Sequence, residues 1–208
     1  MMRMRKLAIL GASGHGKVVA DIAELNGYDV IFFDDAFPTK EKVEHWQIIG
    51  CSTDLLNSAH DYEICIAIGN NLIRQQKQVQ LKQAGGRFPV IAHPNAAISR
   101  YAMIAEGAVV MAGATINAFA QVKCGVIVNT CAVVEHDCML NEFCHISPNA
   151  TLAGGVEVGK CAWVGAGAVV KQLVSVNGYS VIGAGSVVIN DIPERATAVG
   201  VPAKIKEV

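Results

Sequence analysis

An aliphatic residue recurs at every sixth position through the second half of the chain, and this period constrains the fold more than any other feature. The series contains Ile98, Ile104, Val110, Ile116, Val122, Val128, Val134, Leu140, Ile146, Leu152, Val158, Val164, Val170, Val176, Ile182 and Val188. An α-helix has about 3.6 residues per turn and drifts off this register within about two turns, whereas six is a multiple of the strand period. The repeat excludes a helix here and predicts short strands.

Small side chains form a second series, four residues after the first. It contains Ala102, Ala108, Ala114, Ala120, Ala132, Cys138, Cys144, Ala150, Ala162, Ala168, Ser180 and Ser186. Both series must face a narrow interior, which predicts short strands with a corner in each hexad, stacked as a parallel β-helix. The period leaves the handedness open, and the general crossover rule favours a right-handed coil.

The first ninety residues lack this repeat. Apolar runs predict buried strands, and two amphipathic segments predict helices; the strands fall at 6–12, 29–35 and 63–71, and the helices within 11–25 and 70–86. Asn70 or Asn71 is expected to cap the second helix, and Gly85 and Gly86 to end it. Alternating strands and helices predict a small, Rossmann-like parallel sheet.

These patterns divide the chain into two predicted domains. We expect an α/β domain over 1–92, followed over 93–208 by an all-β parallel β-helix with a C-terminal tail. The formal net charge is −1 and no Lys/Arg-rich run occurs, so neither nucleic acid nor a membrane surface is an expected partner. The apolar run at the start is too short for a signal peptide, and the seven cysteines include no CxxC motif, so we expect a cytoplasmic protein with reduced thiols.

A glycine-rich turn precedes the first predicted helix. Its residues Gly11, Ser13, Gly14, His15 and Gly16 do not have the spacing of the dinucleotide fingerprint. The backbone N–H groups of such a turn can still bind a phosphate at the N-terminus of a helix. Two carboxylates, Asp34 and Asp35, end the second strand, where they can accept hydrogen bonds from a nucleotide. A tight structural turn and a solvated strand end are equally compatible with these residues.

The stretch VVEHD interrupts the apolar repeat with a charged pair. Since Val134 faces inward, His136 and Asp137 fall at a corner, where side chains leave the core. A histidine titrates near neutrality and can take a proton from an amine or hydroxyl nucleophile, and Asp137 could hold the ring. These two residues are the predicted catalytic pair.

Two glycines follow this pair after eighteen residues, which is one coil if three hexads make a turn. Gly154 is then expected over His136 and Gly155 over Asp137, at the strand spacing of about 4.8 Å. The absent side chain would leave room for a thioester, and the Gly154 N–H could polarise its carbonyl. Alternatively, both glycines serve only the positive φ of a bend.

His145 occupies an outward strand position just before inward Ile146. Roughly 9 residues, or up to about 30 Å of chain, separate it from His136. The two histidines are not expected to touch within one chain, so a site using both would lie between subunits. The alternative is an exposed structural histidine.

Five segments together resemble one family. They are GASGHGKVV, FFDD, AIGNN, VNTCAVVEHD and GVPAK. They resemble the hexapeptide-repeat sugar acyltransferases related to the sialic acid O-acetyltransferases, and within that group the bacterial N-acetyltransferases of UDP-linked 4-amino-4,6-dideoxy sugars, the bacillosamine-pathway type. The resemblance implies a left-handed β-helix, a homotrimer, and acetyl-CoA as co-substrate between neighbouring prisms. No metal is expected, because the repeat lacks a third suitably placed histidine.

The resemblance also implies roles for individual residues. The first domain would bind the nucleotide sugar, with His15 near the sugar and Asp35 near the uridine; Gly11, Ser13, Gly14, Gly16, Asp34, Asn70 and Asn129 complete the predicted substrate site. Acetyl-CoA would contact His145, Gly154, Gly155, Lys171, Pro202 and Lys204. Isolated surface lysines can equally be only solvated.

The expected activity is acetyl transfer from acetyl-CoA to the 4-amino group of a UDP-linked sugar, with His136 as general base. O-acetylation of a sialic-acid-like sugar and a non-catalytic, trimeric sugar-nucleotide-binding role are alternatives. A zinc hydratase on the same fold needs three histidine ligands, and only His136 and His145 are suitably placed on the repeat.

Overall fold

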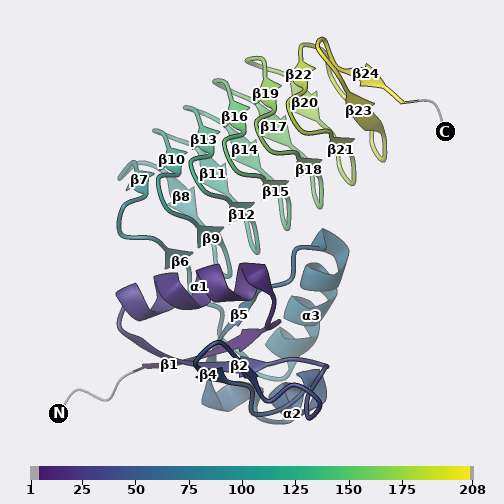
Figure 1. The fold of residues 1–208 in the computed structure, drawn as a ribbon. Coiled ribbons are helices and arrows are strands. Elements are labelled where there is room, and N and C mark those ends of the chain that lie inside the picture. Colours follow the sequence, from purple (N-terminus) through teal and green to yellow (C-terminus); the bar gives the residue numbers. More distant parts are fainter. Residues whose placement is uncertain (1–4, 207–208) are drawn as a thin grey trace. The chain divides into compact units, whose positions relative to one another are not determined.

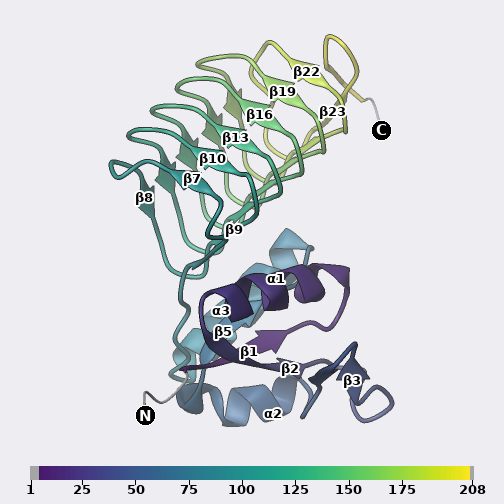
Figure 2. The ribbon, with the colours of Figure 1, turned by 60° about the vertical axis from the view of Figure 1, so that its left-hand side comes forward.

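The computed structural model describes residues 5–206. The chain divides into two compact units, Met1–Pro94 and Asn95–Val208 (Figures 1 and 2). The outermost residues of the two predicted domains, 1–4 and 207–208, lie outside the described residues.

The first unit is built on a three-stranded parallel sheet with the order β2-β1-β5. Its strands are β1 (Arg5–Leu10), β2 (Tyr28–Phe33) and β5 (Glu63–Ile66), and its main helices are α1 (Gly14–Leu25) and α3 (Asn71–Gln83). The predicted α/β class is confirmed. Leu7, Ile9 and Phe32 are fully buried, which makes the centre of the sheet the core of this unit.

Shorter elements fill the segment between β2 and β5. They are the antiparallel pair β3 (Lys42–Val43) and β4 (Trp46–Gln47), helix α2 (Ser52–Asn57) and the 3₁₀ turn η1 (Ala59–Asp61). None is long enough to show a hydrophobic period, so the sequence did not predict them.

The second unit consists of two-residue strands, and each predicted aliphatic residue is the second residue of one of them. The strands are β7 (Ala97–Ile98), β8 (Met103–Ile104), β9 (Val109–Val110), β10 (Thr115–Ile116), β11 (Gln121–Val122), β12 (Ile127–Val128), β13 (Val133–Val134), β14 (Met139–Leu140), β15 (His145–Ile146), β16 (Thr151–Leu152), β17 (Glu157–Val158), β18 (Trp163–Val164), β19 (Val169–Val170), β20 (Ser175–Val176), β21 (Val181–Ile182) and β22 (Val187–Val188). They are preceded by β6 (Ile91–Ala92) and followed by β23 (Thr197–Val199) and β24 (Lys204–Ile205).

Each strand from β7 to β19 pairs in parallel with the strand eighteen residues later, as Thr115 does with Val133 and Val133 with Thr151. One face follows the order β22-β19-β16-β13-β10-β7 and another the order β20-β17-β14-β11-β8, while the third contains β21, β18, β15, β12 and β9. The coils stack as a left-handed parallel β-helix of about six turns (Figure 1). The repeat predicted this solenoid, and the family resemblance predicted its hand.

The interior is filled by the two predicted series. Val110 and Val188 are both 0% exposed, and so are Ala114 and Ala168 from the small series. Ile98, in contrast, is 37% exposed because β7 is the edge strand of its sheet.

Corners of two residues join the strands, and from Gly107 to Gly185 the second residue of each has a positive φ. At one edge of the prism these second residues are Phe119 (φ 63°), Asp137 (φ 61°), Gly155 (φ 66°) and Leu173 (φ 61°). This left-handed region is uncommon for side chains other than Gly, Asn and Asp. The corners therefore hold side chains outward at fixed heights, in a column set by the eighteen-residue register.

Candidate active site

The column of corners formed by 118–119, 136–137, 154–155 and 172–173 carries the predicted catalytic pair; we call it the His136 edge. Backbone hydrogen bonds connect its levels: the Gly155 N–H donates to the His136 carbonyl (2.9 Å), and the Leu173 N–H donates to the Gly154 carbonyl (3.1 Å). The ladder fixes the order of the side chains along the edge.

His136 and Asp137 bond to each other. The imidazole Nδ1 lies 2.8 Å from a carboxylate oxygen of Asp137, and the two side chains are 63% and 62% exposed. An ionised carboxylate only accepts hydrogen bonds, so the hydrogen-bond geometry assigns the proton to Nδ1 and leaves a lone pair on Nε2 of the neutral ring. This is the arrangement of a general base whose tautomer is held by a neighbouring acid.

Gly154 lies over His136, at the level that the eighteen-residue register predicts. A Cβ atom at Gly154 would lie 2.6 Å from both Cε1 and Nε2 of His136, so the ring itself occupies the space left by the missing side chain. Gly155 is contacted from the next coil, because a Cβ atom there would lie 2.7 Å from Cδ2 of Leu173. The glycine pair forms a notch that receives one side chain from each adjacent coil.

A pocket of about 440 Å³ opens at this notch. It is lined by His136, Asp137, Ala153, Gly154, Gly155, Gln172 and Leu173. Within residues 5–206 the Gly154 N–H has no hydrogen-bond acceptor, which leaves a backbone donor beside the imidazole. A base and a free N–H in one pocket are the elements that acyl transfer requires.

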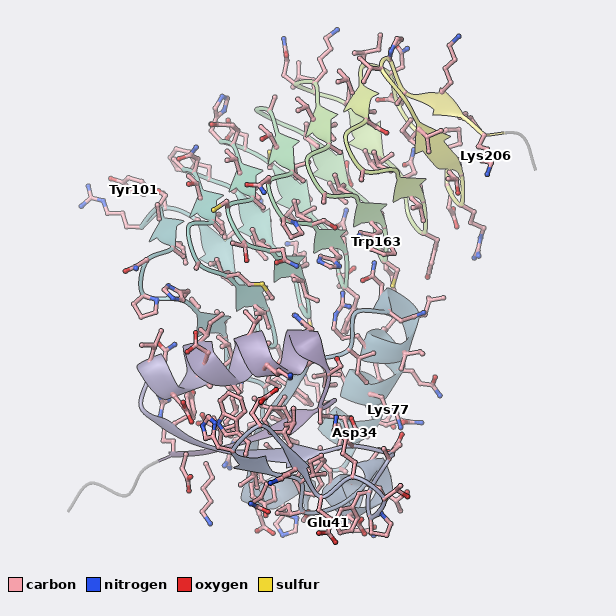
Figure 3. All side chains as sticks on the ribbon, viewed as in Figure 1. Asp34, Glu41, Lys77, Tyr101, Trp163 and Lys206 are labelled. Atoms are coloured by element: carbon pink, nitrogen blue, oxygen red, sulfur yellow. The ribbon has the colours of Figure 1, made fainter. Side chains whose placement is uncertain are left out.

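His145 lies on β15, on a different face of the prism from β13. It points outward as expected but is only 9% exposed, so the alternative of an exposed histidine is wrong. Its ring stacks on the indole of Trp163 (centroids 5.8 Å apart, planes 4° apart), and Trp163 donates from Nε1 to the Ser147 hydroxyl at 2.7 Å. Trp163 occupies the position eighteen residues on, in β18 (Figure 3).

Asn129 orients the same ring. Its Oδ1 accepts a hydrogen bond from the Thr130 N–H (2.8 Å), which places its Nδ2 donor 3.0 Å from Nε2 of His145. A donor at Nε2 requires a lone pair there, so the neutral ring of His145 carries its proton on Nδ1. Its lone pair is engaged by the protein.

A second pocket, of about 280 Å³, lies in the first unit at the carboxyl ends of the strands. It is lined by Leu10, Gly11, Ser13, Asp34, Asp35, Ala67, Ile68 and Gly69. The structure therefore brings together four of the predicted substrate residues. Open α/β sheets bind ligands at this end.

The glycines of the turn have separate roles in this unit. Gly11 has φ +110°, and a Cβ there would lie 2.9 Å from the Ala67 carbonyl oxygen; a Cβ at Gly16 would lie 2.2 Å from the Gly11 carbonyl oxygen. These two positions allow the turn, α1 and the end of β5 to approach closely. Among residues 5–206, no atom beyond its chain neighbours and its own helix backbone lies within 4 Å of a Cβ at Gly14, so that position is open.

Both aspartates hold backbone groups. Asp34 accepts from the Ala12 N–H (2.7 Å) in the turn, and Asp35 accepts from the Ser52 N–H (2.8 Å). The hydrogen bonds from Ser52, followed by the charge of Lys77 at 3.7 Å, lower the pKa of Asp35 below its usual value. Figure 3 labels Asp34 and Lys77 in this unit.

His15 is half-buried at the start of α1. Burial, and then the charge of Arg74, lower its pKa to about 4, so the ring is neutral at physiological pH. Within the described residues its Nε2 is buried without a hydrogen-bond partner. Arg74, 2% exposed, donates to the Ile68 carbonyl (3.0 Å) and to Oδ1 of Asn71 (2.8 Å).

Comparison with known proteins agrees with this geometry. Residues 6–81 match the family described as the PglD N-terminal domain. The acetyltransferase domain of PglB from Neisseria gonorrhoeae, solved in complex with acetyl coenzyme A, is 43% identical with a TM-score of 0.93 over 98% of this chain and 100% of that one. The chain belongs to the hexapeptide-repeat sugar N-acetyltransferases.

Two further relatives of this sugar N-acetyltransferase are described with a nucleotide-linked sugar. A histidine-to-asparagine variant of perosamine N-acetyltransferase from Caulobacter crescentus, solved with CoA and GDP-perosamine, is 36% identical with a TM-score of 0.94 over 99% of each chain. UDP-N-acetylbacillosamine N-acetyltransferase from Bacillus subtilis is 40% identical over 113 residues, which is 52% of each chain.

Other predicted site residues of this sugar N-acetyltransferase lie apart from the two pockets. Asn70 caps α3 by accepting from the N–H groups of Leu72 and Ile73 (3.0 and 3.1 Å). Lys171 is exposed and directly precedes Gln172 of the His136 pocket, whereas Pro202 and Lys204 are exposed in the tail after β23.

Sequence reasoning missed four residues near these sites. Gln172 and Leu173 line the His136 pocket, Trp163 stacks on His145, and Lys77 pairs with Asp35. The first three follow from the eighteen-residue register, because Gln172 lies two coils after His136 and Trp163 one coil after His145. No sequence signal placed Lys77 beside Asp35.

The part of the chain that the structure describes contains no helix long and apolar enough to span a membrane. Among those same residues no group of three or more His, Cys, Asp or Glu side chains is placed to hold a metal ion. The cysteines are free thiols.

Proposed function

We propose that the protein transfers the acetyl group of acetyl-CoA to the 4-amino group of a UDP-linked 4-amino-4,6-dideoxy sugar, with His136 as general base. The observation that carries the proposal is the imidazole of His136, bonded through Nδ1 to Asp137 and presenting Nε2 to the notch at Gly154. The acetyl coenzyme A in one relative and the UDP-linked sugar in the name of another support the two substrates.

The chemistry follows from the lone pair on Nε2. As the amine nitrogen attacks the thioester carbon, Nε2 takes the proton that the nitrogen loses, a contribution worth about 10²–10⁴ in rate. Asp137 stabilises the imidazolium that forms. The new C–N bond replaces the C–S bond, CoA leaves as a thiolate, and the imidazolium returns the proton to the sulfur or to solvent.

The Gly154 N–H is the proposed donor to the oxygen that becomes negative during attack. One such donor typically contributes about 2.7–4 kcal/mol of barrier reduction. Binding both substrates in one site adds the advantage of proximity, and no covalent bond to the protein is needed. His145 is proposed to contact the acetyl group through its ring, which Asn129 holds in place at Nε2.

The pocket of the first unit is proposed to bind the nucleotide. The N–H groups at the start of α1, with Gly14 open beside them, can receive the diphosphate. Asp35 is ionised and its side chain is 64% exposed, so it can accept hydrogen bonds from the base or ribose. His15, neutral at physiological pH, is proposed to lie near the sugar.

A homotrimer with acetyl-CoA between neighbouring prisms is part of the proposal. The His136 edge exposes large apolar side chains, with Phe119 61% and Leu173 78% exposed. Phe119 also stacks on Tyr101, which is 52% exposed (ring centroids 5.5 Å apart), and exposed apolar clusters of this kind are typical of protein or ligand contact surfaces. We place the reaction in the cytoplasm, where acetyl-CoA is available.

A GDP-linked amino sugar is the second candidate acceptor. The relative solved with GDP-perosamine covers 99% of the chain at 36% identity, whereas the UDP-specific name belongs to a match over 52% of it. The two candidates share the reaction and differ in the base that the pocket of the first unit must accept.

An acceptor comparison tests the proposal. The purified protein is incubated with acetyl-CoA and, in turn, a UDP-linked 4-amino-4,6-dideoxy sugar, GDP-perosamine or free sialic acid, and CoA release and acetylated product are measured. We expect the highest kcat/KM for the UDP sugar and the product acetylated on nitrogen. A higher kcat/KM for GDP-perosamine supports the second candidate, and transfer only to sialic acid contradicts both.

A matched variant separates chemistry from binding in the same assay. His136→Ala is expected to abolish most transfer while still binding acetyl-CoA in calorimetry, because the side chain is largely exposed and its loss leaves the solenoid core intact. Full activity of this variant would contradict its role as base.

A further inference from the structure

Leu173 is the most exposed large apolar side chain of the solenoid over the described residues 95–206, with 78% of its surface exposed. Its φ of 61° is the left-handed value that other second corner residues share, among them Phe119 and Phe143. This corner geometry holds the Leu173 side chain outward on the His136 edge, two levels above Asp137.

The side chain of Leu173 turns back toward the catalytic corner. Its Cδ2 approaches the backbone of Gly155 so closely that a Cβ there would lie 2.7 Å away, while the His136 ring approaches Gly154 from the coil below. The notch is therefore bounded by Nε2 of His136 on one side and by a leucine methyl group on the other.

The remaining walls of the pocket are small or polar. Ala153 and the two glycines form its floor, and Gln172 and Asp137 supply the polar groups. Leu173 is the only large apolar side chain among the lining residues. A thioester bound in this pocket with its carbonyl beside Nε2 of His136 would direct its acyl chain toward Leu173.

We propose that Leu173 is a specificity-determining residue that limits the transferred acyl group to acetyl. Its methyl groups occupy the space beside Gly155 into which a longer chain would extend. This inference rests on the proposed function, since it concerns the acyl donor at the same pocket. One added methylene in an apolar pocket commonly changes discrimination by about 10–200-fold.

The test measures acyl-chain preference directly. The full-length protein and the variants Leu173→Ala, Leu173→Asn and Leu173→Phe are assayed with acetyl-, propionyl- and butyryl-CoA and the preferred amino-sugar acceptor. We expect the propionyl-to-acetyl ratio of kcat/KM to rise about tenfold or more in Leu173→Ala. The ratio should rise also in Leu173→Asn and fall in Leu173→Phe.

The fold supports these substitutions. Asn149 and Phe143 already occupy second corner positions with φ of 57° and 58°, so Asn and Phe are compatible with this backbone. Tyr179, at the same corner position (φ 58°) on another edge, provides the matched control: Tyr179→Ala should leave the acyl ratio unchanged.

The outcomes separate this inference from the proposed function. Unchanged acyl ratios across the Leu173 variants, with acetyl transfer intact in the parent, overturn the inference and leave the proposed function standing; weakened self-association would then assign Leu173 to a subunit contact. If the parent transfers no acyl group, the proposed function fails. In that case calorimetry decides the inference about Leu173. The affinity for propionyl- and butyryl-CoA relative to acetyl-CoA should rise in Leu173→Ala and Leu173→Asn and fall in Leu173→Phe.

Discussion

His136 and His145 occupy the same solenoid and carry opposite tautomers. At the corner, a carboxylate of Asp137 faces Nδ1 and leaves Nε2 with its lone pair. On the strand, an amide donor of Asn129 faces Nε2 and leaves the proton on Nδ1. One ring is exposed and the other is buried. The neighbour that each ring bonds therefore decides which histidine keeps an accessible lone pair and can act as a base.

Removing each imidazole in turn is the strongest test of this contrast. We expect His136→Ala to lower kcat by about 10²–10⁴-fold with little change in the KM for acetyl-CoA, because proton transfer is lost. His145→Ala is expected to raise the KM for acetyl-CoA more than it lowers kcat, because only a contact is lost. Steady-state kinetics on both variants measure these changes. Equal losses of kcat in His136→Ala and His145→Ala would contradict the assignment of His136 alone as the base.

Moving the base without removing it should have the next largest effect. In Gly154→Ala the added Cβ would lie 2.6 Å from Nε2, so the ring must leave its position, and we expect kcat to fall about 10²-fold. Ala118 and Ala166 already occupy first corner positions, so the backbone accepts alanine and Tm should change little.

Gly155→Ala is the matched control for that variant. Its φ of +66° makes alanine strained by about 1–2 kcal/mol. For a chain of this size each kcal/mol corresponds to a Tm lowered by about 2–4 °C. Thermal unfolding and steady-state kinetics are measured on both variants. We expect kcat to fall most in Gly154→Ala and Tm to fall most in Gly155→Ala, and the reverse pattern would contradict the notch geometry.

Weakening the Asp137 contact should have a smaller effect. Asn tolerates the positive φ of this corner, so Asp137→Asn keeps the fold and removes the negative charge that stabilises the imidazolium. We expect kcat to fall about tenfold, less than for a buried acid, because the pair is exposed and screened by water. The difference between parent and variant should narrow in high salt, as measured by kcat at increasing ionic strength.

Reversing the tautomer at the strand should have the smallest effect on rate. Asn129→Asp replaces the donor at Nε2 with an acceptor, so the proton should move from Nδ1 to Nε2 of His145 or be held on both. Nitrogen NMR of labelled protein would show protonation at Nδ1 alone in the parent and at Nε2 in the variant. An Nε2-protonated parent would disprove the assigned contrast.

The parts of the molecule that follow a period could be predicted from sequence. The six-residue repeat predicted every strand from β7 to β22, and the eighteen-residue register predicted that Gly154 lies over His136. Both depend only on backbone geometry, which repeats from coil to coil.

Side-chain directions could not be predicted in the same way. The notch at Gly154 and Gly155 is filled by His136 from one coil and Leu173 from the other, a choice of rotamers that no register fixes. In the first unit, the bond from the Ala12 N–H to Asp34 joins residues 22 positions apart, and the elements between β2 and β5 are too short to have a period.

The register has a consequence for how such an enzyme can change. Each coil adds one step of about 4.8 Å along the prism. Deleting a single residue between Val134 and Leu152 would rotate every later side chain away from its face and carry Gly154 off His136. Inserting or removing eighteen residues above Leu173 would lengthen or shorten the molecule by one step and leave the reacting corner unaltered, so whole coils are the natural unit of variation in this scaffold.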